Sequence, residues 1–407
     1  MSPPPTDEPS TYFRKGFGLK AAVQEDLSAD YDGRIVDLLR SQAYTLVVDN
    51  VTVRLAREFG FCYGVERAVE YAYQARRKFP DRRLFLVGEI IHNPHVNARL
   101  RELGVEILER PEPTGAFDFS RIQPDDVVIM PAFGATIADF SALRAIGCVL
   151  VDTTCGSVLN VWKRVESYAR DGFTSLIHGK YYHEETRATA SQVSKYDDGH
   201  FIIVRDMDEA RVVCDYIEGK VSPEDLMARF GRAVSPGFDP LRHLKRIGVA
   251  NQTTMLAKES LAIADEVGAA IARARGDDAR ATDFRSFDTI CSATQERQDA
   301  VKELLEEGVD VMVVIGGFNS SNTISLAQLC AEHVPTYHIE TSSGIDPDAG
   351  SIHYRVAAVK HDEADKTNWL PDGPVRVGVT AGASTPNNKI GDVVTRILAT
   401  RGLRIDV

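Results

Sequence analysis

The amino-acid sequence predicts an α/β protein of three similar units, each with a small parallel sheet, in a pseudo-threefold or trefoil arrangement. Two observations predict this fold. Short apolar runs such as LFLVGEIIHN and VMVVIGGFNSSN are followed by a small or polar turn and then by an amphipathic segment, which is typical of parallel strands buried on both faces. A cysteine also recurs in each third of the chain, with polar groups following at a nearly constant distance.

Length and composition restrict the possible classes of function. A chain of 407 residues is long enough for two or three domains, and its net charge of -12 disfavours a nucleic-acid partner. No uncharged apolar run approaches the roughly 20 residues of a membrane span, and the opening MSPPPTDEPS has no apolar stretch of a secretory signal. We therefore expect a cytoplasmic protein with no membrane partner.

The division of the chain follows the recurring pattern. Residues 1-50 are expected to form an N-terminal arm with an aromatic and basic anchor, YFRKGF, and one helix. The first α/β unit is predicted at 51-150, the second at 151-285 and the third at 286-407. A segment near 219-245, rich in proline, glycine and charge, predicts an insertion over one face of the second unit.

Three of the six cysteines are candidate metal ligands. Cys62, Cys155 and Cys291 are each expected to end a strand, whereas the other three lie in apolar segments and are interpreted as small buried hydrophobic residues. Their wide spacing does not fit C-x-x-C zinc sites. Three thiolates would leave one iron of a four-iron four-sulfur (4Fe-4S) cluster open to bind a substrate oxygen. The sequence therefore predicts one catalytic iron–sulfur cluster at the centre of the three units.

Two further strand ends in each unit carry candidate substrate ligands. His92, His183 and Ser320 follow the three cysteines by 30, 28 and 29 residues. The later strand ends are Phe133, Thr253 and Ser384. Because the carboxyl ends of parallel strands meet at one edge of a sheet, these residues are expected to face a shared centre.

Two of these segments suggest a chemical role. Glu185, in YYHEET, could relay protons to a leaving hydroxyl near the open iron. Ser320, Ser321 and Asn322, in GGFNSSNT, stand at a predicted helix start, where amides and hydroxyls bind phosphate, although an ordinary helix cap explains them as well.

The source of electrons is expected to lie outside the chain. Neither a P-loop nor a GxGxxG turn after a first strand is present, which argues against a bound nucleotide cofactor. The basic run ARRKFPDRR could dock an acidic ferredoxin or flavodoxin, although a solvated helix end is the commoner explanation of such a run.

Two other classes of function stay open at this point. A non-catalytic iron–sulfur sensor or electron carrier would need the cysteines but not the polar strand ends. A zinc- or thiol-dependent hydrolase acting on a phosphate ester would need neither iron nor an electron donor.

Eight ordered segments resemble one enzyme family. FGFCYGVERAV, IIHNP, VDTTC, HEET, NQTTM, DTICSATQERQDAV, FNSSNT and GVTAGAS are similar to segments of 4-hydroxy-3-methylbut-2-enyl diphosphate reductases, the last enzymes of the methylerythritol phosphate route. The resemblance runs from about Tyr12 to the C-terminus. It implies a 4Fe-4S cluster whose unique iron binds the hydroxymethyl oxygen of a small allylic diphosphate, with isopentenyl and dimethylallyl diphosphate as products.

The same resemblance implies a role for each candidate residue. Cys62, Cys155 and Cys291 would ligate the cluster, Glu185 would deliver protons, and Thr253 would help to position them. The substrate and its diphosphate would be held by His92, His183, Thr253, Ser320, Ser321, Asn322 and Ser384.

One departure concerns the diphosphate. Where many bacterial members have a histidine in an S-A-H-G segment, this chain has Phe133 in PAFG, which removes one donor. PAFG and the long N-terminal arm resemble the plant and cyanobacterial branch, so we expect an active enzyme with altered diphosphate contacts.

Overall fold

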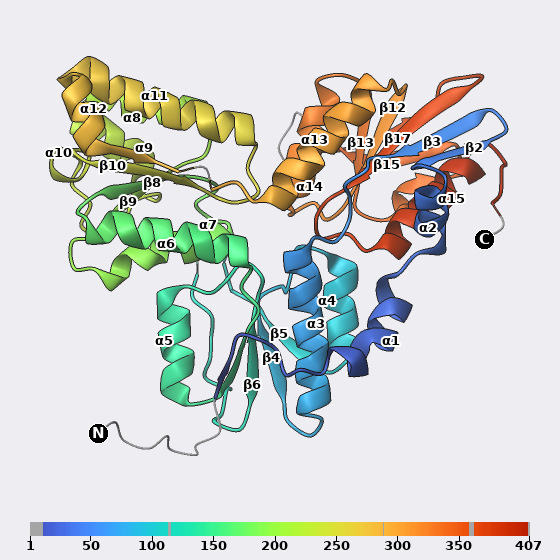
Figure 1. The fold of residues 1–407 in the computed structure, drawn as a ribbon, viewed down its shortest axis with the longest axis horizontal. Helices are drawn as coiled ribbons and strands as arrows, with labels where there is room; N and C mark the ends of the chain where they lie inside the picture. The colour runs from blue at the N-terminus through green and yellow to red at the C-terminus, as the bar shows by residue number, and fades with distance from the viewer. Residues whose placement is uncertain (1–10, 113–114, 288, 358–361, 406–407) are drawn as a thin grey trace.

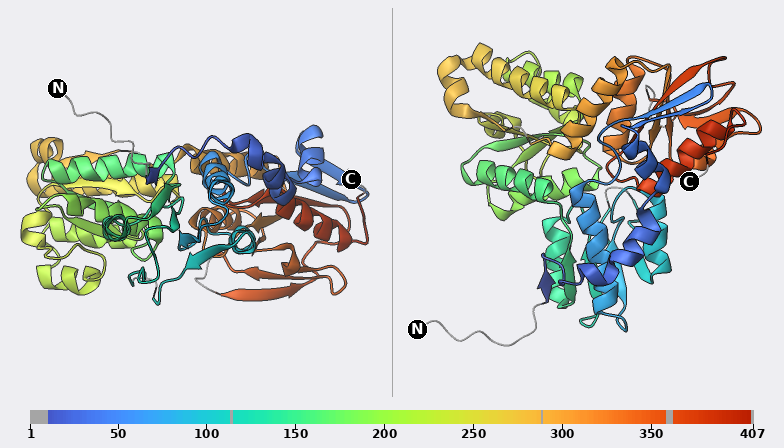
Figure 2. Two further views of the ribbon diagram at one scale, coloured as in Figure 1. Left: turned by 90° about the horizontal axis from the view of Figure 1, so that it is seen from below. Right: turned by 45° about the vertical axis from the view of Figure 1, so that its right-hand side comes forward.

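Three sheets covered by helices form three lobes around a common centre (Figure 1). The computed structural model describes residues 11–112, 115–287, 289–357 and 362–405. Turned by 90°, the molecule is shallower, so the lobes lie beside one another in one layer (Figure 2). The predicted α/β fold with small, largely parallel sheets is confirmed.

The first sheet has five parallel strands in the order β1-β7-β6-β4-β5. Every residue of β4, β6 and β7 is buried, as expected for central strands with helices on both faces. The strands are β1 (Tyr12–Phe13), β4 (Leu84–Val87), β5 (Val105–Leu108), β6 (Val127–Met130) and β7 (Val149–Asp152). The helices of this lobe are α3 (Tyr63–Lys78), α4 (Pro94–Glu102) and α5 (Ile137–Ile146).

The second sheet has four parallel strands in the order β11-β10-β8-β9. They are β8 (Thr174–His178), β9 (Phe201–Val204), β10 (Ile247–Asn251) and β11 (Phe284–Ser286). The helices here are α6 (Gly156–Arg170), α7 (Glu184–Ser191), η1 (Gln192–Lys195), α8 (Met207–Ile217), α9 (Pro223–Phe230), α10 (Pro240–His243), α11 (Ala257–Arg275) and α12 (Asp277–Asp283). Leu226, Phe230 and Phe238 are buried in this core, so residues 219-245 are packed as part of the lobe.

The third sheet has eight strands and is mixed, with the order β14-β15-β13-β12-β17-β3-β2 and β16 paired to β15. Its central pairs β13-β12, β12-β17 and β17-β3 are parallel. The strands are β2 (Thr45–Val48), β3 (Val51–Leu55), β12 (Val311–Ile315), β13 (Thr336–Ile339), β14 (Ile345–Asp346), β15 (Ser351–Arg355), β16 (Glu363–Thr367) and β17 (Val375–Ala381). Its helices are α13 (Ser292–Glu306), α14 (Ser321–Ala331), η2 (Ser342–Gly344) and α15 (Asn387–Ala399).

The N-terminal segment joins two lobes. Its single expected helix is two helices, α1 (Lys20–Tyr31) and α2 (Arg34–Ser41), because Asp32 is extended and ends the first one. Strand β1 adds to the first sheet, whereas α2 packs on α15 of the third lobe. Among the described residues, no helix is both long enough and apolar enough to cross a membrane.

The chain changes sheets near each of the three candidate cysteines. It leaves β3 of the third sheet for α3, leaves β7 of the first sheet for α6 on β8 and β10, and leaves β11 of the second sheet for α13. Residues 51-55 were expected in the first unit but pair with β17 in the third sheet. The division at residues 50, 150 and 285 therefore stays a prediction, and sheet membership does not follow it at every point.

Candidate active site

The three candidate cysteines share one local position, which is the N-cap of a long helix. Cys62 precedes α3, Cys155 precedes α6 and Cys291 precedes α13. They were expected to end strands, but β3 ends at Leu55 and β11 at Ser286, so turns separate those strands from the cysteines. The helix N-terminus is the position at which backbone amides and the helix dipole favour a thiolate over a thiol.

The sulfur atoms converge on one small space. A Cβ atom added to Gly64 would lie 2.5 Å from Cys155 Sγ and 3.9 Å from Cys62 Sγ, so only glycine fits there. The pKa of Cys62 is raised in part by the charge of Cys155, and that of Cys291 in part by the charges of Cys62 and Glu185. Two thiols beside a glycine, with a third thiol near enough to Cys62 to feel its charge, fit a metal cluster, because thiolates of like charge need a shared cation.

Burial dominates the electrostatics of this centre. It raises the pKa of the Cys62 thiol and raises that of Cys291 to about 11, while hydrogen bonds from Thr294 to the Cys291 sulfur act in the opposite direction. Arg297 also favours the Cys62 thiolate; it is buried and donates to Gly60 O over 2.7 Å. A metal bound by these thiols would therefore have to displace their protons, and the Thr294 hydrogen bonds and Arg297 assist that ionisation.

The buried carboxyl group next to this centre is Glu185. It is 2% exposed, and the backbone N–H of Thr253 donates to Glu185 Oε1 over 2.6 Å. Burial raises the pKa of Glu185 to about 7, although the Thr253 hydrogen bonds oppose the shift. The carbonyl of Thr253 in turn accepts from the Cys291 backbone N–H at 3.4 Å, which joins the carboxyl to the third cysteine.

Three aromatic rings close another side of the site. Phe133 stacks on His92 with ring centroids 4.3 Å apart, and His183 meets both rings edge-on. His92 Nδ1 lies 2.8 Å from Glu89 Oε2, and its Nε2 lies 3.6 Å from Glu184 Oε2, too far for a hydrogen bond. Phe133 thus occupies the first unit's later strand end without offering a hydrogen-bond donor.

The hydroxyl groups of the third unit lie at the start of α14. Ser320 is the N-cap and accepts from Thr323 N, while Asn322 Oδ1 accepts from Ala383 N over 2.9 Å. Asn322 Nδ2 is buried and has no hydrogen-bond partner. Ser384 Oγ donates to His92 O over 3.1 Å, so the third unit contacts the first at this point.

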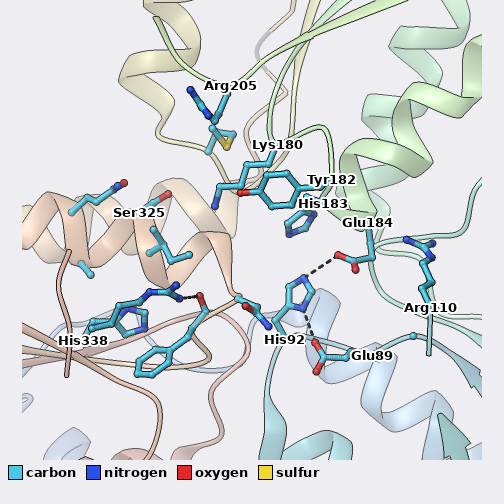
Figure 3. A pocket seen from close by; sticks show the side chains of 18 of the residues that line it. Glu89, His92, Arg110, Lys180, Tyr182, His183, Glu184, Arg205, Ser325 and His338 are labelled. Carbon is cyan, nitrogen blue, oxygen red and sulfur yellow. Dashed lines mark hydrogen bonds and ion pairs between the residues drawn. The ribbon is translucent and has the colours of Figure 1, made fainter. Parts of the chain in front are cut away.

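Two cavities border the site. One, of about 850 Å³, is lined by His92, His183, Glu184 and Lys180, as Figure 3 shows. The other, of about 590 Å³, is lined by Cys291 together with residues of α6. Neither cavity is lined by Glu185, Thr253, Ser320, Ser321 or Ser384.

Comparison with known proteins gives one family. The family model described as LytB protein matches residues 53–398. A protein of Thermosynechococcus vestitus named 4-hydroxy-3-methylbut-2-enyl diphosphate reductase is 46% identical over 96% of this chain and 95% of its own length. A protein of the same name from Gloeobacter violaceus is 47% identical over 96% and 93%.

This chain belongs to the LytB family of reductases. A solved structure titled as (E)-4-hydroxy-3-methyl-but-2-enyl diphosphate reductase, the terminal enzyme of the non-mevalonate pathway, shares 29% identity and covers 85% of this LytB protein and 98% of its own chain, with a TM-score of 0.52. A reductase structure from Plasmodium falciparum has the same fold at 20% identity, covers 85% of this chain and 87% of its own, and has a TM-score of 0.62.

Sequence reasoning missed two charged residues of this LytB protein's site. Glu184, the neighbour of Glu185, was given no role, but it faces His92 and lines the larger cavity with it. Lys180 was not singled out, yet its ammonium group donates to Ser321 Oγ over 3.1 Å. The available signal was its position two residues after the end of β8, at the same sheet edge as the polar strand ends.

Proposed function

We propose that this chain reduces (E)-4-hydroxy-3-methylbut-2-enyl diphosphate to isopentenyl and dimethylallyl diphosphate. The reaction consumes two electrons and two protons, breaks the carbon–oxygen bond of the hydroxymethyl group, forms a carbon–hydrogen bond and releases water. The names of the relatives support this reaction. The structural observation that carries it is the meeting of three N-cap cysteines with a buried, hydrogen-bonded carboxyl group.

Cys62, Cys155 and Cys291 would hold one 4Fe-4S cluster. When bound, such a cluster supplies electrons and an iron with an open coordination position. Backbone N–H groups at the start of α3 and Arg297 favour the Cys62 thiolate, and Gly64 keeps the space between Cys62 and Cys155 free of side-chain atoms.

Glu185 would deliver a proton to the departing hydroxyl oxygen. Its raised pKa keeps the carboxyl largely protonated below about pH 7, where a carboxyl group of ordinary pKa would be ionised. The Thr253 N–H fixes one oxygen, which leaves the carboxyl few orientations. A hydroxide ion is a poor leaving group, so protonation as the bond breaks lowers the barrier.

The diphosphate would bind where α14 begins. Ser320, Ser321, Asn322 and Ser384 offer hydroxyl and amide donors, and the helix dipole favours negative charge at its N-terminus. His92 and His183 complete the wall on the side of the first and second units.

The reaction is tested by anaerobic turnover with a chemical reductant. Holoenzyme reconstituted with iron and sulfide should be brown and convert the allylic diphosphate to both products. Cys148→Ser is a matched control, because Cys148 lies outside the centre and donates to Leu143 O at 3.6 Å, a role that a hydroxyl can take over. A colourless, zinc-loaded preparation with full activity would contradict the proposed function.

The external electron donor would be an acidic ferredoxin or flavodoxin that docks beside Cys291. Lys163 and Arg164 are exposed and line the 590 Å³ cavity with Cys291, and none of the described lining residues is acidic. Arg164 lies 4.0 Å over the Phe287 ring, which is 44% exposed, and Tyr63, directly after Cys62, is 79% exposed. Exposed aromatic and arginine side chains are common anchors of protein interfaces.

The basic run 75-83 fits this role less well. It lies at the other end of α3 from Cys62, about 20 Å away along the helix. Arg76 is bound to carbonyls of its own turn and Arg83 to Asp126.

A donor-specific assay separates these two surfaces. Arg164→Glu should slow ferredoxin-driven turnover several-fold at low salt while turnover with a small chemical reductant stays unchanged. Arg77→Glu, an exposed change at the far end of α3, is the control. Equal slowing by both variants would contradict docking beside Cys291.

A further inference from the structure

The diphosphate end of the site is poor in positive charge. Its hydroxyl and amide donors are neutral, and Phe133, which stacks on His92, offers no hydrogen-bond donor. Burial lowers the pKa of His183 well below its ordinary value, which favours the neutral form of that ring. His92 lies between Glu89 and Glu184, which offset any charge that it carries. A diphosphate with two or more negative charges needs a further cation.

Lys180 reaches this place from the second unit. Its ammonium group donates to Ser321 Oγ over 3.1 Å, and Ser321, the first residue of α14, is 3% exposed. Figure 3 shows the Lys180 side chain extending toward α14. Its charge also contributes to the lowered pKa of His183, which places it close to that ring.

The backbone of Lys180 is held on both sides. Its N–H donates to Gln252 Oε1 at 3.3 Å, and its carbonyl accepts from His183 N at 2.9 Å. The neighbouring Gly179 is buried, and a Cβ atom there would lie 2.8 Å from Thr186 Oγ1. The side chain therefore starts from a fixed point, which reduces the entropy lost when its ammonium group binds an anion.

Buried nitrogen atoms without hydrogen-bond partners lie on the same side of the site. Asn322 is 2% exposed and its Nδ2 has no hydrogen-bond partner. His92 Nε2 is also buried without one, and the His92 side chain is 10% exposed. A buried amide N–H₂ without an acceptor is unfavourable unless a ligand supplies the acceptor. Asn322 follows Ser321 directly, so an oxygen-rich anion at the start of α14 can satisfy it beside the Lys180 ammonium group.

We propose that Lys180 is a diphosphate ligand that supplies, from the second unit, the donor that Phe133 does not supply from the first. This inference rests on the proposed function, because it takes the substrate to be a diphosphate. Its ammonium group would bind a diphosphate oxygen together with Ser321 Oγ, while Phe133 keeps the His92 ring in place by stacking.

The test is the binding of inorganic diphosphate to anaerobic holoenzyme, measured by calorimetry. Lys180→Met keeps the length of the side chain and removes the charge, and should weaken binding ~10- to 100-fold. The remaining affinity should depend less on salt, because one ion pair is missing. The visible spectrum should not change, since Lys180 is not one of the proposed cluster ligands.

Two further variants separate direct binding from a structural role. If Lys180 only positions Ser321, Ser321→Ala should lose as much affinity as Lys180→Met, and both should retain the salt dependence of the wild type. If Lys180 binds the anion, Lys180→Met should lose more, and adding Phe133→His to it should restore part of the affinity. Unchanged affinity in Lys180→Met, or equal losses with wild-type salt dependence, would overturn the proposal.

The binding measurement and the turnover measurement test the two proposals separately. If the wild type binds inorganic diphosphate through Lys180 yet does not reduce the allylic diphosphate, the anion site stands and the proposed reaction is wrong. If it turns over the substrate and Lys180→Met binds diphosphate normally, the reaction stands and Lys180 is not a ligand.

Discussion

The cysteine centre and the diphosphate end draw on the same three units in different ways. At the cysteine centre each unit contributes the same element, a cysteine at the N-cap of a long helix. At the diphosphate end the units differ: the first offers two aromatic rings, the second a lysine, and the third hydroxyl groups at a helix start.

This difference follows from the shapes of the two proposed ligands. An iron–sulfur cluster has nearly equivalent corners, so identical positions around a threefold axis suit it. An allylic diphosphate has a charged end and a reacting end, so each unit must supply a different group. The absence of a hydrogen-bond donor at Phe133 is therefore tolerable at the diphosphate end, because other units can supply a donor. A missing cysteine ligand cannot be replaced by a neighbouring residue.

The largest expected effect is at the cysteine centre. Cys155→Ser should abolish turnover and the brown colour, because the 4Fe-4S cluster would lose one of its three thiolates. Iron content and visible absorbance check this, with Cys330→Ala, a buried thiol in the α14 core, as control. If Cys155→Ser keeps its full iron content and rate, Cys155 is not a ligand.

The next effect concerns the unit that supplies the proton. Glu185→Gln should keep the cluster spectrum and lower kcat ~100- to 10,000-fold, because an amide accepts the Thr253 N–H but cannot donate an acidic proton. Glu166→Gln, which removes a surface pair with Lys195, should leave the rate unchanged. A Glu185→Gln rate near that of the wild type would remove the proton-delivery role.

The pH dependence tests the same carboxyl group without a mutation. Because burial raises the pKa of Glu185 to about 7, the proton is present below that pH and lost above it. Turnover should therefore fall by about tenfold per pH unit once the pH is well above 7. The residual activity of Glu185→Gln should lack this fall; a fall shared by both proteins must come from another group.

The smallest effect is expected at a single neutral donor of the diphosphate end. Ser320→Ala should raise KM several-fold, about the contribution of one hydrogen bond to a charged oxygen, and leave the spectrum unchanged. The change also removes a helix cap, which costs about 1 kcal/mol of stability. Ser222→Ala removes a comparable cap from α9, away from the site, and should leave KM unchanged. A KM shift shared by both variants would be an effect of stability alone.

Sequence could predict the α/β class because strand burial and polar strand ends are local patterns. The spacing from the cysteine to the next polar strand end is nearly the same in all three units, which shows that such a pattern persists although the units differ in detail. The helix-cap position of the cysteines was not predictable, since cysteine is not a preferred cap residue. Nor was the pairing of β3 with β17, because the sheet that a strand joins depends on contacts distant in sequence.

Charged residues that act across units were also out of reach of sequence reasoning. Lys180 meets Ser321 although 141 positions separate them, and no local pattern marks such a pair. Phe133 could be recognised as a departure, but its stacking on His92 depends on how two strand ends of one sheet approach each other.

The three cysteines lie where the chain passes from one lobe to the next. Their position would allow the cell to recognise molecules that have lost the metal cluster. The metal cluster would be bound by one cysteine at each of the three passages between lobes. Its loss would therefore loosen all three passages at once without unfolding any lobe. Oxidative damage to the cofactor would then be visible to proteases as newly accessible junctions, so that inactive molecules could be removed selectively.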